Sequence, residues 1–291
     1  MQSVSKSGRT RQQNARARIA EQRAAAKRRD TRNRLLFTGG IIVLVVAIVV
    51  VFLVVKAGSG SPKASGSSAG TVLPAGVARQ VTSVPASALS TVGSGSVRSF
   101  TPDPVRAISG TPLTRNGKPE MLYIGAEFCP YCAELRWSMA VALSRFGTFT
   151  TPLRGIHSSP TDVYPSTATL TFYQAGYTSK YLTFTPVENE TVDRAPLQAT
   201  TAQQQAIWDK YDANNYPFIY FGGKYMITTP IYDPQVLQGK TWAQIAAALH
   251  DPSSAIAQGA LGAANYMTAA ICKMTGNQPA SVCSSLPVST P

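Results

Sequence analysis

The fold is decided by residues 119–149, PEMLYIGAEFCPYCAELRWSMAVALSRFGTF. Within this stretch MLYIG, residues 121–125, reads as a short buried strand, because it is an apolar run bounded by Pro119 and the AEF segment. After Cys129, apolar residues recur at three- and four-residue spacing as far as Gly147, which predicts a helix with one apolar face. The sequence therefore predicts a strand-to-helix junction with Cys129 at the junction itself.

Two cysteines mark this junction, in the motif Cys129-Pro130-Tyr131-Cys132. Pro130 falls at the first helical position, where its missing N–H costs nothing. A thiolate at a helix N-terminus is stabilised by unpaired backbone N–H groups and by the helix dipole, which lowers its pKa. The second cysteine lies three residues further on the same face, within reach of a disulfide. We therefore expect Cys129 to be an accessible nucleophile and Cys132 to resolve the mixed disulfide.

A single CxxC motif has two other interpretations, an inert structural disulfide and one half of a zinc site. Zinc would need two further ligands. The remaining cysteines and histidines form no second closely spaced pair in the sequence; they are His157, His250, Cys272 and Cys283. We therefore expect thiol chemistry with no metal and no cofactor.

Two residues close to Cys129 each have two interpretations. Glu127, two residues before the nucleophile, is a candidate modulator of the Cys129 pKa or a proton relay, but it also fits a solvated loop carboxylate. Tyr131 either presents an aromatic rim to a substrate or fills the turn.

A second pair of cysteines, Cys272 and Cys283, is separated by ten residues near the C-terminus. In an oxidising compartment we expect them to form a structural disulfide, worth up to about 3 kcal/mol in the chain-entropy model. The alternative is a shuttle pair that exchanges electrons with Cys129 and Cys132.

The chain between and around these cysteines predicts further strands and helices. FTTPLRGIHS, residues 149–158, suits the next strand of the sheet, and residues 159–198 contain two alternating stretches typical of an added β-hairpin or insertion. A helix is expected at 200–212. NNYPFIYFGGKYMI, residues 214–227, then predicts two strands joined by a Gly-Gly turn, with Pro217 at the head of the first. Helices are expected in the segments 233–251 and 253–274.

The formal net charge of +13 belongs mainly to the N-terminus, because residues 1–34 hold eleven Lys and Arg against two acidic residues. Residues 35–55, LLFTGGIIVLVVAIVVVFLVV, carry no charge, and 21 helical residues reach about 31 Å, the thickness of a bilayer core. A cleaved signal peptide and a buried core helix are weaker interpretations of this segment. We expect a single transmembrane helix.

The positive-inside rule places the basic tail in the cytoplasm and everything after the anchor outside it. We therefore interpret the tail as a topology determinant rather than a nucleic-acid-binding arm. Residues 56–79, rich in Gly, Ser and Ala, predict a flexible linker. The folded domain is expected to begin at residue 80 and to run to 291, with residues 251–291 as a C-terminal helical extension.

The order strand–CxxC–helix–strand, then helix–proline–strand–strand–helix, resembles the thioredoxin superfamily, and the CPYC motif is similar to that of glutaredoxins. YIGAEFCPYCAELRW, ALSRFGTF and YPFIYFGGKY resemble a family of uncharacterised, membrane-anchored thioredoxin-like proteins of bacteria and archaea, a domain of unknown function, over roughly residues 80–285. The resemblance implies a central mixed sheet flanked by helices, with the 159–198 insertion added. It also implies that Pro217 is a cis-proline facing the CxxC motif.

The expected function is thiol–disulfide exchange on exported proteins by a membrane-anchored extracytoplasmic oxidoreductase, with Cys129 and Cys132 as its reactive pair. Its expected partners are exported protein thiols and disulfides and a membrane electron-transfer partner, not nucleic acid. Glutathione-dependent reduction is disfavoured, because it belongs in the cytosol. The alternatives are a non-catalytic binding or scaffold module with structural disulfides, and a metallochaperone, for which the sequence lacks a His/Met cluster near the motif.

Overall fold

The computed structural model describes residues 70–284 and 286–289. The basic tail expected at 1–34, the membrane-spanning helix expected at 35–55 and most of the expected linker lie outside these residues. Among the described residues, no helix is both long enough and apolar enough to cross a membrane.

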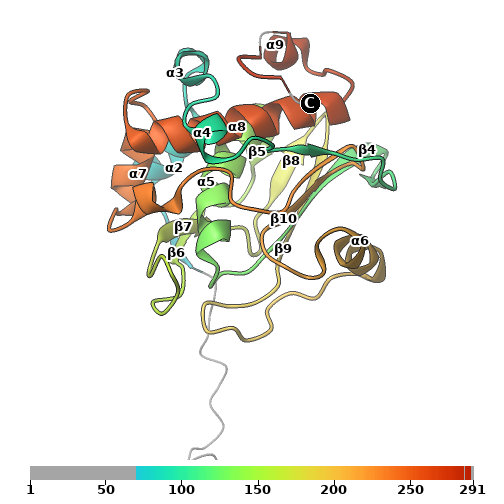
Figure 1. Ribbon diagram of the computed structural model, residues 1–291, viewed down its shortest axis with the longest axis horizontal. Coiled ribbons are helices and arrows are strands. Elements are labelled where there is room, and N and C mark those ends of the chain that lie inside the picture. Colours follow the sequence, from blue (N-terminus) through green and yellow to red (C-terminus); the bar gives the residue numbers. More distant parts are fainter. Residues whose placement is uncertain (1–69, 285, 290–291) are drawn as a thin grey trace, which may run out of the picture. The chain divides into compact units, whose positions relative to one another are not determined.

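A mixed six-stranded sheet forms the centre of the described chain (Figure 1). Its strands hydrogen-bond in the order β2-β11-β10-β4-β3, and β9 also pairs with β4. The strands are β2 (Arg106–Ala107), β3 (Thr114–Arg115), β4 (Lys118–Gly125), β9 (Thr183–Glu188), β10 (Phe218–Phe221) and β11 (Tyr225–Ile227). β4 runs antiparallel to β10 and parallel to β9. The strand expected at 121–125 is therefore an interior strand, and its burial on both faces explains its continuous apolar run. The α/β architecture with a mixed central sheet is confirmed.

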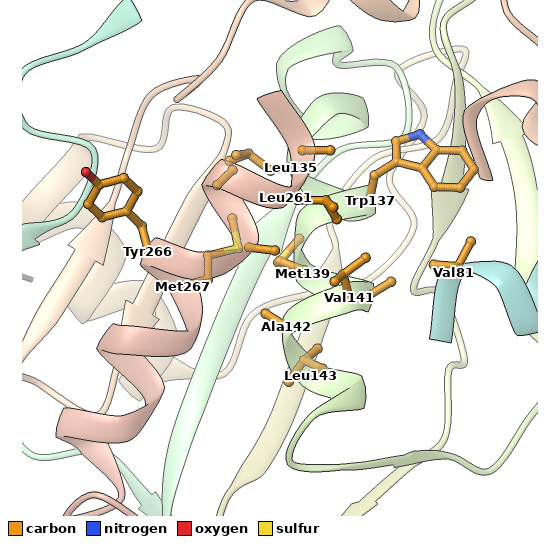
Figure 2. Close-up of a cluster of buried hydrophobic side chains, with 14 of the residues drawn as sticks. Val81, Leu135, Trp137, Met139, Val141, Ala142, Leu143, Leu261, Tyr266 and Met267 are labelled. Atoms are coloured by element: carbon orange, nitrogen blue, oxygen red, sulfur yellow. The ribbon is translucent and has the colours of Figure 1, made fainter. Parts of the chain in front are cut away.

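Helix α5 (Pro130–Ser144) follows β4 after a short turn. The spacing predicted one apolar face, but the structure buries every residue of α5 from Cys132 to Leu143. The helix packs against α8 (Ala255–Met274), against β7 (Ala168–Thr171) and against α2 (Ala75–Thr82). Figure 2 shows Met139 of α5 close to side chains of α8. Because it is covered on several sides, α5 is a core helix that cannot shift without disturbing the whole domain.

The segment expected to supply the next strand lies in a different sheet. β6 (Arg154–His157) pairs with β1 (Thr71–Val72) and with β7 in a separate three-stranded sheet, so the placement of residues 149–158 in the central sheet was wrong. The pairing partners of a strand are not encoded in its own alternation, which is why the sequence did not separate the two sheets.

Residues 159–198 do not form an appended hairpin. Their two alternating stretches become β7 and β9, which lie in different sheets and do not pair with each other. Between them β8 (Tyr177–Ser179) pairs with β5 (Gly147–Phe149). Because β9 extends along β4 from Glu120 to Gly125, this segment is part of the central sheet itself.

The folded region begins earlier than the expected boundary at residue 80. β1 and α2 occupy residues that the composition assigned to the linker, and Leu73 between them is buried. Two short helices follow, α3 (Ala86–Val92), directly after Pro85, and α4 (Val97–Phe100). Single apolar residues such as Leu73 and Val81 are enough to anchor this segment, although its mean composition resembles a tether.

The second half of the chain follows the expected order of elements. Helix α6 (Ala202–Asp212) begins at a capping box formed by Thr201 and Gln204. Gly222 and Gly223 turn the β10–β11 hairpin with φ of 57° and 89°, values that favour glycine. The helix expected at 233–251 is divided into η1 (Pro234–Leu237) and α7 (Trp242–Ala248).

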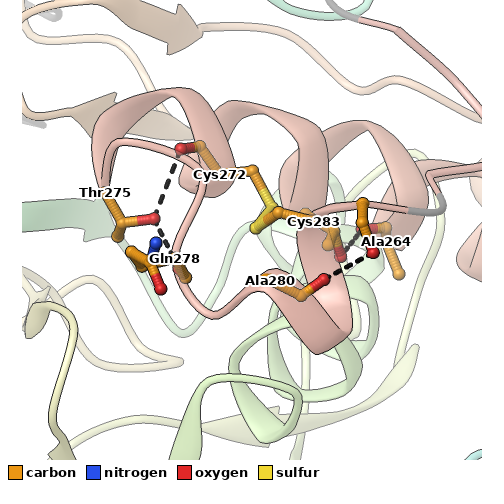
Figure 3. Close-up of a disulfide and its surroundings, with 8 residues drawn as sticks. Ala264, Cys272, Thr275, Gln278, Ala280 and Cys283 are labelled. Carbon is orange, nitrogen blue, oxygen red and sulfur yellow. Dashed lines mark hydrogen bonds between the residues drawn. A yellow bond between two sulfur atoms is a disulfide. The ribbon is translucent and has the colours of Figure 1, made fainter.

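The C-terminal cysteines form a disulfide, as expected (Figure 3). Cys272 lies near the end of α8 and Cys283 at the end of α9 (Ala280–Cys283), with their Cα atoms 5.7 Å apart. The bond ties the short helix α9 to the long core helix α8. Met274 of α8 packs against Gly222, at the end of the sheet where β4 begins.

Candidate active site

Cys129 occupies the N-cap position of α5, directly after the turn that follows β4. Its Sγ accepts a hydrogen bond from the Cys132 amide N–H at 3.3 Å, and Pro130 takes the first helical position, as expected. Both cysteines are free thiols. Cys129 is only 4% exposed and Cys132 is completely buried. Cys129 is therefore the outer thiol of the pair, but it is less accessible than the sequence suggested.

The two thiols differ in acidity. The pKa of Cys129 lies below its usual value, because the Cys132 thiol and amide N–H donate to its sulfur and the Arg136 charge adds to their effect, while burial opposes it. The pKa of Cys132 lies well above its usual value, because the thiol is buried and its hydrogen bond to Cys129 favours the protonated form. One thiol thus favours the thiolate and the other keeps its proton.

Behind the thiols lies a buried ion pair. Arg136, one turn after Cys132, donates from Nε to Glu188 Oε1 at 2.9 Å and from Nη2 to Glu188 Oε2 at 2.6 Å. Both side chains are fully buried. Burial would lower the Arg136 pKa, but Glu188, together with Tyr123 and Cys132, holds the pKa above its usual value. A permanent positive charge therefore lies beneath the cysteine pair.

Arg136 also fixes the turn that carries Cys129. Its Nη2 donates to the Ala126 carbonyl oxygen at 2.8 Å, and the same oxygen accepts the Cys129 N–H at 3.2 Å. Glu188 is in turn held by the Phe172 N–H, which donates to its Oε1. The N-cap geometry of Cys129 is thereby connected to β9 by direct hydrogen bonds.

Glu127 is buried, so its interpretation as a solvated loop carboxylate was wrong. Its Oε1 accepts the Thr171 hydroxyl at 2.7 Å, and its Oε2 has no hydrogen-bond partner among the described residues. Burial raises the Glu127 pKa to about 7, with Glu188 adding to the shift and the Thr171 hydrogen bond and Arg136 opposing it. A carboxyl with this pKa, two residues from Cys129, can accept or release a proton near neutral pH.

A third buried carboxyl, Glu134, lies on α5 beyond Cys132. Its Oε1 accepts the backbone N–H groups of Ile231 and Tyr232, both at 3.0 Å. Burial raises its pKa well above the usual range despite these two hydrogen bonds. Glu134 therefore ties α5 to the chain that follows the β10–β11 hairpin.

Pro217 heads β10 as expected, and the Tyr216–Pro217 peptide bond is cis. The Tyr216 ring makes an edge contact with Phe128 at 5.9 Å between centroids and belongs to the apolar cluster around Cys129. Its hydroxyl donates to Asn189 Oδ1 at 2.5 Å and also contacts Glu190 Oε1. This places the proline strand beside the cysteine pair.

Tyr131 is half-buried, and its ring makes an edge contact with Tyr164 at 6.0 Å between centroids. The ring therefore fills the turn, packing against the apolar cluster around Cys129 and against the loop before β7, while a contact of Tyr131 with substrate stays a prediction.

The structural cysteine pair lies away from this site. Cys129 follows the C-terminal end of β4, whereas Met274 of α8, near Cys272, packs at the other end, where the Gly222 N–H donates to the Glu120 carbonyl. Gly125 lies five residues along β4 from Glu120, which corresponds to a rise of about 17 Å. Direct exchange between the two pairs would require a large rearrangement.

Three buried charged side chains near the cysteines were not predicted from the sequence: Arg136, Glu134 and Glu188. Glu134 and Arg136 carried a signal, because they are the only charged residues in the mostly apolar stretch from Ala133 to Leu143, and such residues are expected to be paired when buried. Glu188 carried none, since its partner is 52 residues away. Among the described residues, no group of three or more His, Cys, Asp or Glu side chains is placed to hold a metal ion.

Comparison with known proteins gives a family but no characterised relative. A family model described as "Domain of unknown function (DUF929)" matches residues 104–273, which include β4, α5 and the whole of the site. A second model, "Inhibitor of host cell division protein domain", matches residues 13–67, outside the described part of the chain. No curated protein and no solved structure matches.

Proposed function

The chain belongs to the DUF929 family, whose match covers more than half of its length, and we propose that it is a thiol–disulfide oxidoreductase. The observation that carries the proposal is the asymmetry of the two thiols. Cys129 sits at a helix N-terminus with a lowered pKa, while Cys132 is buried behind it with a raised pKa. A structural pair has no need of this difference, but an exchange reaction does.

The reaction begins with the Cys129 thiolate attacking one sulfur of a substrate disulfide. A protein–substrate mixed disulfide forms, and the first substrate sulfur leaves as a thiolate that takes a proton from water. The hydrogen bonds from Cys132 and the charge of Arg136 stabilise the attacking thiolate beforehand.

In the second step Cys132 loses its proton and attacks Cys129 Sγ. The protein disulfide forms, the second substrate sulfur leaves, and two electrons have passed from the protein to the substrate. Glu127, two residues before Cys129 in the chain and with a pKa of about 7, is the candidate to take the Cys132 proton. The reverse sequence oxidises a substrate dithiol, so the same residues serve both directions.

The proposed fold class is thioredoxin-like. The strand–CxxC–helix unit, the parallel pairing of β4 with β9 and the cis-proline strand beside the cysteines support it. We propose further that the domain is extracytoplasmic and anchored by residues 35–55, which the apolar run and the basic tail support. Exported protein thiols and disulfides are then its substrates, with a membrane electron-transfer partner.

The test is a single-turnover reaction of the reduced full-length protein with hydroxyethyl disulfide, compared with two variants. Cys129→Ser should lower the rate at least about 1,000-fold, because it removes the attacking sulfur. Cys132→Ser should accumulate a mixed disulfide, detected as the added mass of one mercaptoethanol. The reduction potential of the wild-type pair should lie above about −300 mV, because structural disulfides typically have potentials below that value.

The competing function is a scaffold module in which the CxxC pair is only structural. The burial of the CxxC pair favours this alternative, since Cys129 is only 4% exposed. A wild-type protein that fails to react with hydroxyethyl disulfide, together with a potential below about −300 mV, would establish the scaffold and exclude the enzyme.

A further inference from the structure

Two loops of the 159–198 segment lie directly against the turn that carries Cys129. The Ser159 N–H donates to the Phe128 carbonyl at 2.9 Å, and the Glu127 N–H donates to the Glu190 carbonyl at 2.9 Å. The first contact belongs to the loop 159–166 and the second to the loop 189–197. Both residues of the chain that immediately precede Cys129 are therefore held by these loops.

The same loops contribute side chains to the rim of the site. Arg194 lies over the Phe128 ring at 3.6 Å from its centroid and forms an ion pair with Asp162 at 3.3 Å. This pair joins the two loops to each other above Phe128. Tyr164, of the same loop as Asp162, contacts the ring of Tyr131. The loops thus contact residues that precede Cys129 and a residue that follows it in the chain.

The loop 159–166 also exposes an apolar side chain. Val163 is 66% exposed, more than the other two large hydrophobic side chains exposed in the described chain, Val72 at 49% and Phe100 at 43%. It lies next to Tyr164, which faces the cysteine motif. An apolar side chain in this position can contact a substrate held at Cys129.

The charges of the two loops are unbalanced. The two loops contain one basic residue, Arg194, and three acidic residues: Asp162, Glu190 and Asp193. The ion pair accounts for Asp162. The Glu190 carboxylate contacts the neutral Tyr216 hydroxyl, and Asp193 is exposed, so neither carboxylate is paired with a cation of these loops. The rim therefore complements a positively charged ligand.

We propose that the loops 159–166 and 189–197 form the substrate-selecting surface of this site. It takes an extended polypeptide segment whose reactive cysteine is flanked by an aromatic or aliphatic side chain and by Lys or Arg. The apolar side chain contacts Val163 and Tyr164, and the basic side chain meets Asp193. The inference rests on the proposed exchange reaction, but it concerns which substrates react rather than whether exchange occurs.

The experiment uses a short peptide whose single cysteine is linked by a disulfide to 2-mercaptoethanol. Reduced full-length protein converts it to peptide thiol and mercaptoethanol, and the protein gains the Cys129–Cys132 disulfide, so electrons and atoms balance. The parent peptide carries Tyr beside the cysteine and Lys at both flanks. Two matched peptides carry Ser in place of Tyr, or Asp in place of Lys. Hydroxyethyl disulfide provides the same leaving group without a peptide.

We expect the parent peptide to react about tenfold faster than the Asp peptide and about fivefold faster than the Ser peptide, as for single contacts at a binding surface. Val163→Ser and Tyr164→Ala should each lower the rate with the parent peptide about fivefold and leave hydroxyethyl disulfide within twofold. Asp193→Lys should abolish the preference for Lys over Asp.

The variants spare the loop itself. The Tyr164 carbonyl accepts hydrogen bonds from the Ser158 and Thr167 hydroxyls, contacts that a change of the Tyr164 side chain does not touch. Val72→Ser, Phe100→Ala and Asp103→Lys, all at exposed positions outside the two loops, serve as matched controls and should leave every rate unchanged.

The outcomes separate the two proposals. Equal rates for all three peptides, or equal losses with peptide and hydroxyethyl disulfide in the loop variants, overturn the selecting surface while exchange stands. A wild-type protein inactive toward hydroxyethyl disulfide overturns the exchange function itself.

Discussion

The two cysteine pairs of this chain are treated differently by the fold. Cys129 and Cys132 lie within one turn at the start of α5 and are free thiols. Cys272 and Cys283 are 11 residues apart, join two helices and form a disulfide. Sequence spacing permits a bond in either case. The difference therefore lies in the surroundings of each pair.

Charge distinguishes those surroundings. The CxxC pair has a buried arginine and buried carboxyls around it, chiefly Arg136, Glu188 and Glu127. Near the C-terminal disulfide the charged side chains, Lys224 and Lys273, are exposed, and the Cys272 carbonyl accepts the neutral Thr275 hydroxyl (Figure 3). Buried charge is costly, and its concentration at the CxxC pair supports the proposal that this pair carries the reaction.

Among the substitutions that test this difference between the two pairs, Glu188→Gln should change the free energy of unfolding most. The variant leaves the Arg136 charge buried without its partner, so the free energy of unfolding should fall by about 3–5 kcal/mol. Urea unfolding measures it. The matched control is Asp162→Asn, which breaks the exposed ion pair with Arg194 and should cost less than about 1 kcal/mol.

Equal losses in Glu188→Gln and Asp162→Asn would mean that the buried ion pair does not hold the CxxC turn. The thiolate absorbance of Cys129 should be followed in the same samples, because loss of the Glu188 carboxylate leaves the Arg136 charge unopposed and should lower the Cys129 pKa further.

Removing the C-terminal disulfide should lower the stability of the protein without changing its exchange rate. Cys272→Ser combined with Cys283→Ser should lower the free energy of unfolding by about 3 kcal/mol, because a loop of this length is no longer closed in the unfolded chain. The rate with hydroxyethyl disulfide should remain within twofold of the wild type. A lost exchange activity in this variant would show that the second pair takes part in the reaction.

The smallest effect concerns the pH dependence contributed by Glu127. Its pKa is raised from 4.5 to about 7 in the folded protein, so the folded state holds this proton more tightly than the unfolded chain does. The resulting stabilisation is complete below pH 4.5 and is lost as the pH rises through 7. Between pH 4 and pH 8, the free energy of unfolding of Glu127→Gln should therefore rise by roughly 2–3 kcal/mol relative to that of the wild type.

Unfolding of both proteins at pH 4 and pH 8 measures this change. Other groups with raised pKa values, such as Asp212, are present in both proteins, so their contributions cancel in the comparison. A wild type and variant with parallel pH profiles would show that Glu127 does not titrate in this range. The matched kinetic expectation is a slower second step in Glu127→Gln, seen as a longer-lived mixed disulfide.

Much of the site was predictable from local sequence. The strand–CxxC–helix junction, the N-terminal place of Pro130 and the hairpin after Pro217 follow from periodicity, turn chemistry and the restrictions on proline, which act within a few residues. The C-terminal disulfide followed from the expected compartment and a short separation. The capping box at Thr201 belongs with these, since an N-cap is also a local interaction.

The sheet partners were not predictable in the same way. The segment of β6 was expected as the next strand of the sheet and that of β9 as an added hairpin or insertion, but β6 pairs with β1 and β7, while β9 pairs with β4. The N-terminal boundary failed for the same reason, because only its contact with β6 makes β1 part of the fold.

The sequence by itself therefore determined where a reactive thiol can lie, because the N-terminus of a helix after a buried strand is set by neighbouring residues. Only the tertiary structure decided what surrounds that thiol. It brought Glu188 to Arg136 and Thr171 to Glu127 across separations of 52 and 44 residues, and buried them together. Burial and long-range pairing set the pKa values of these groups, and neither is encoded in the spacing of a motif.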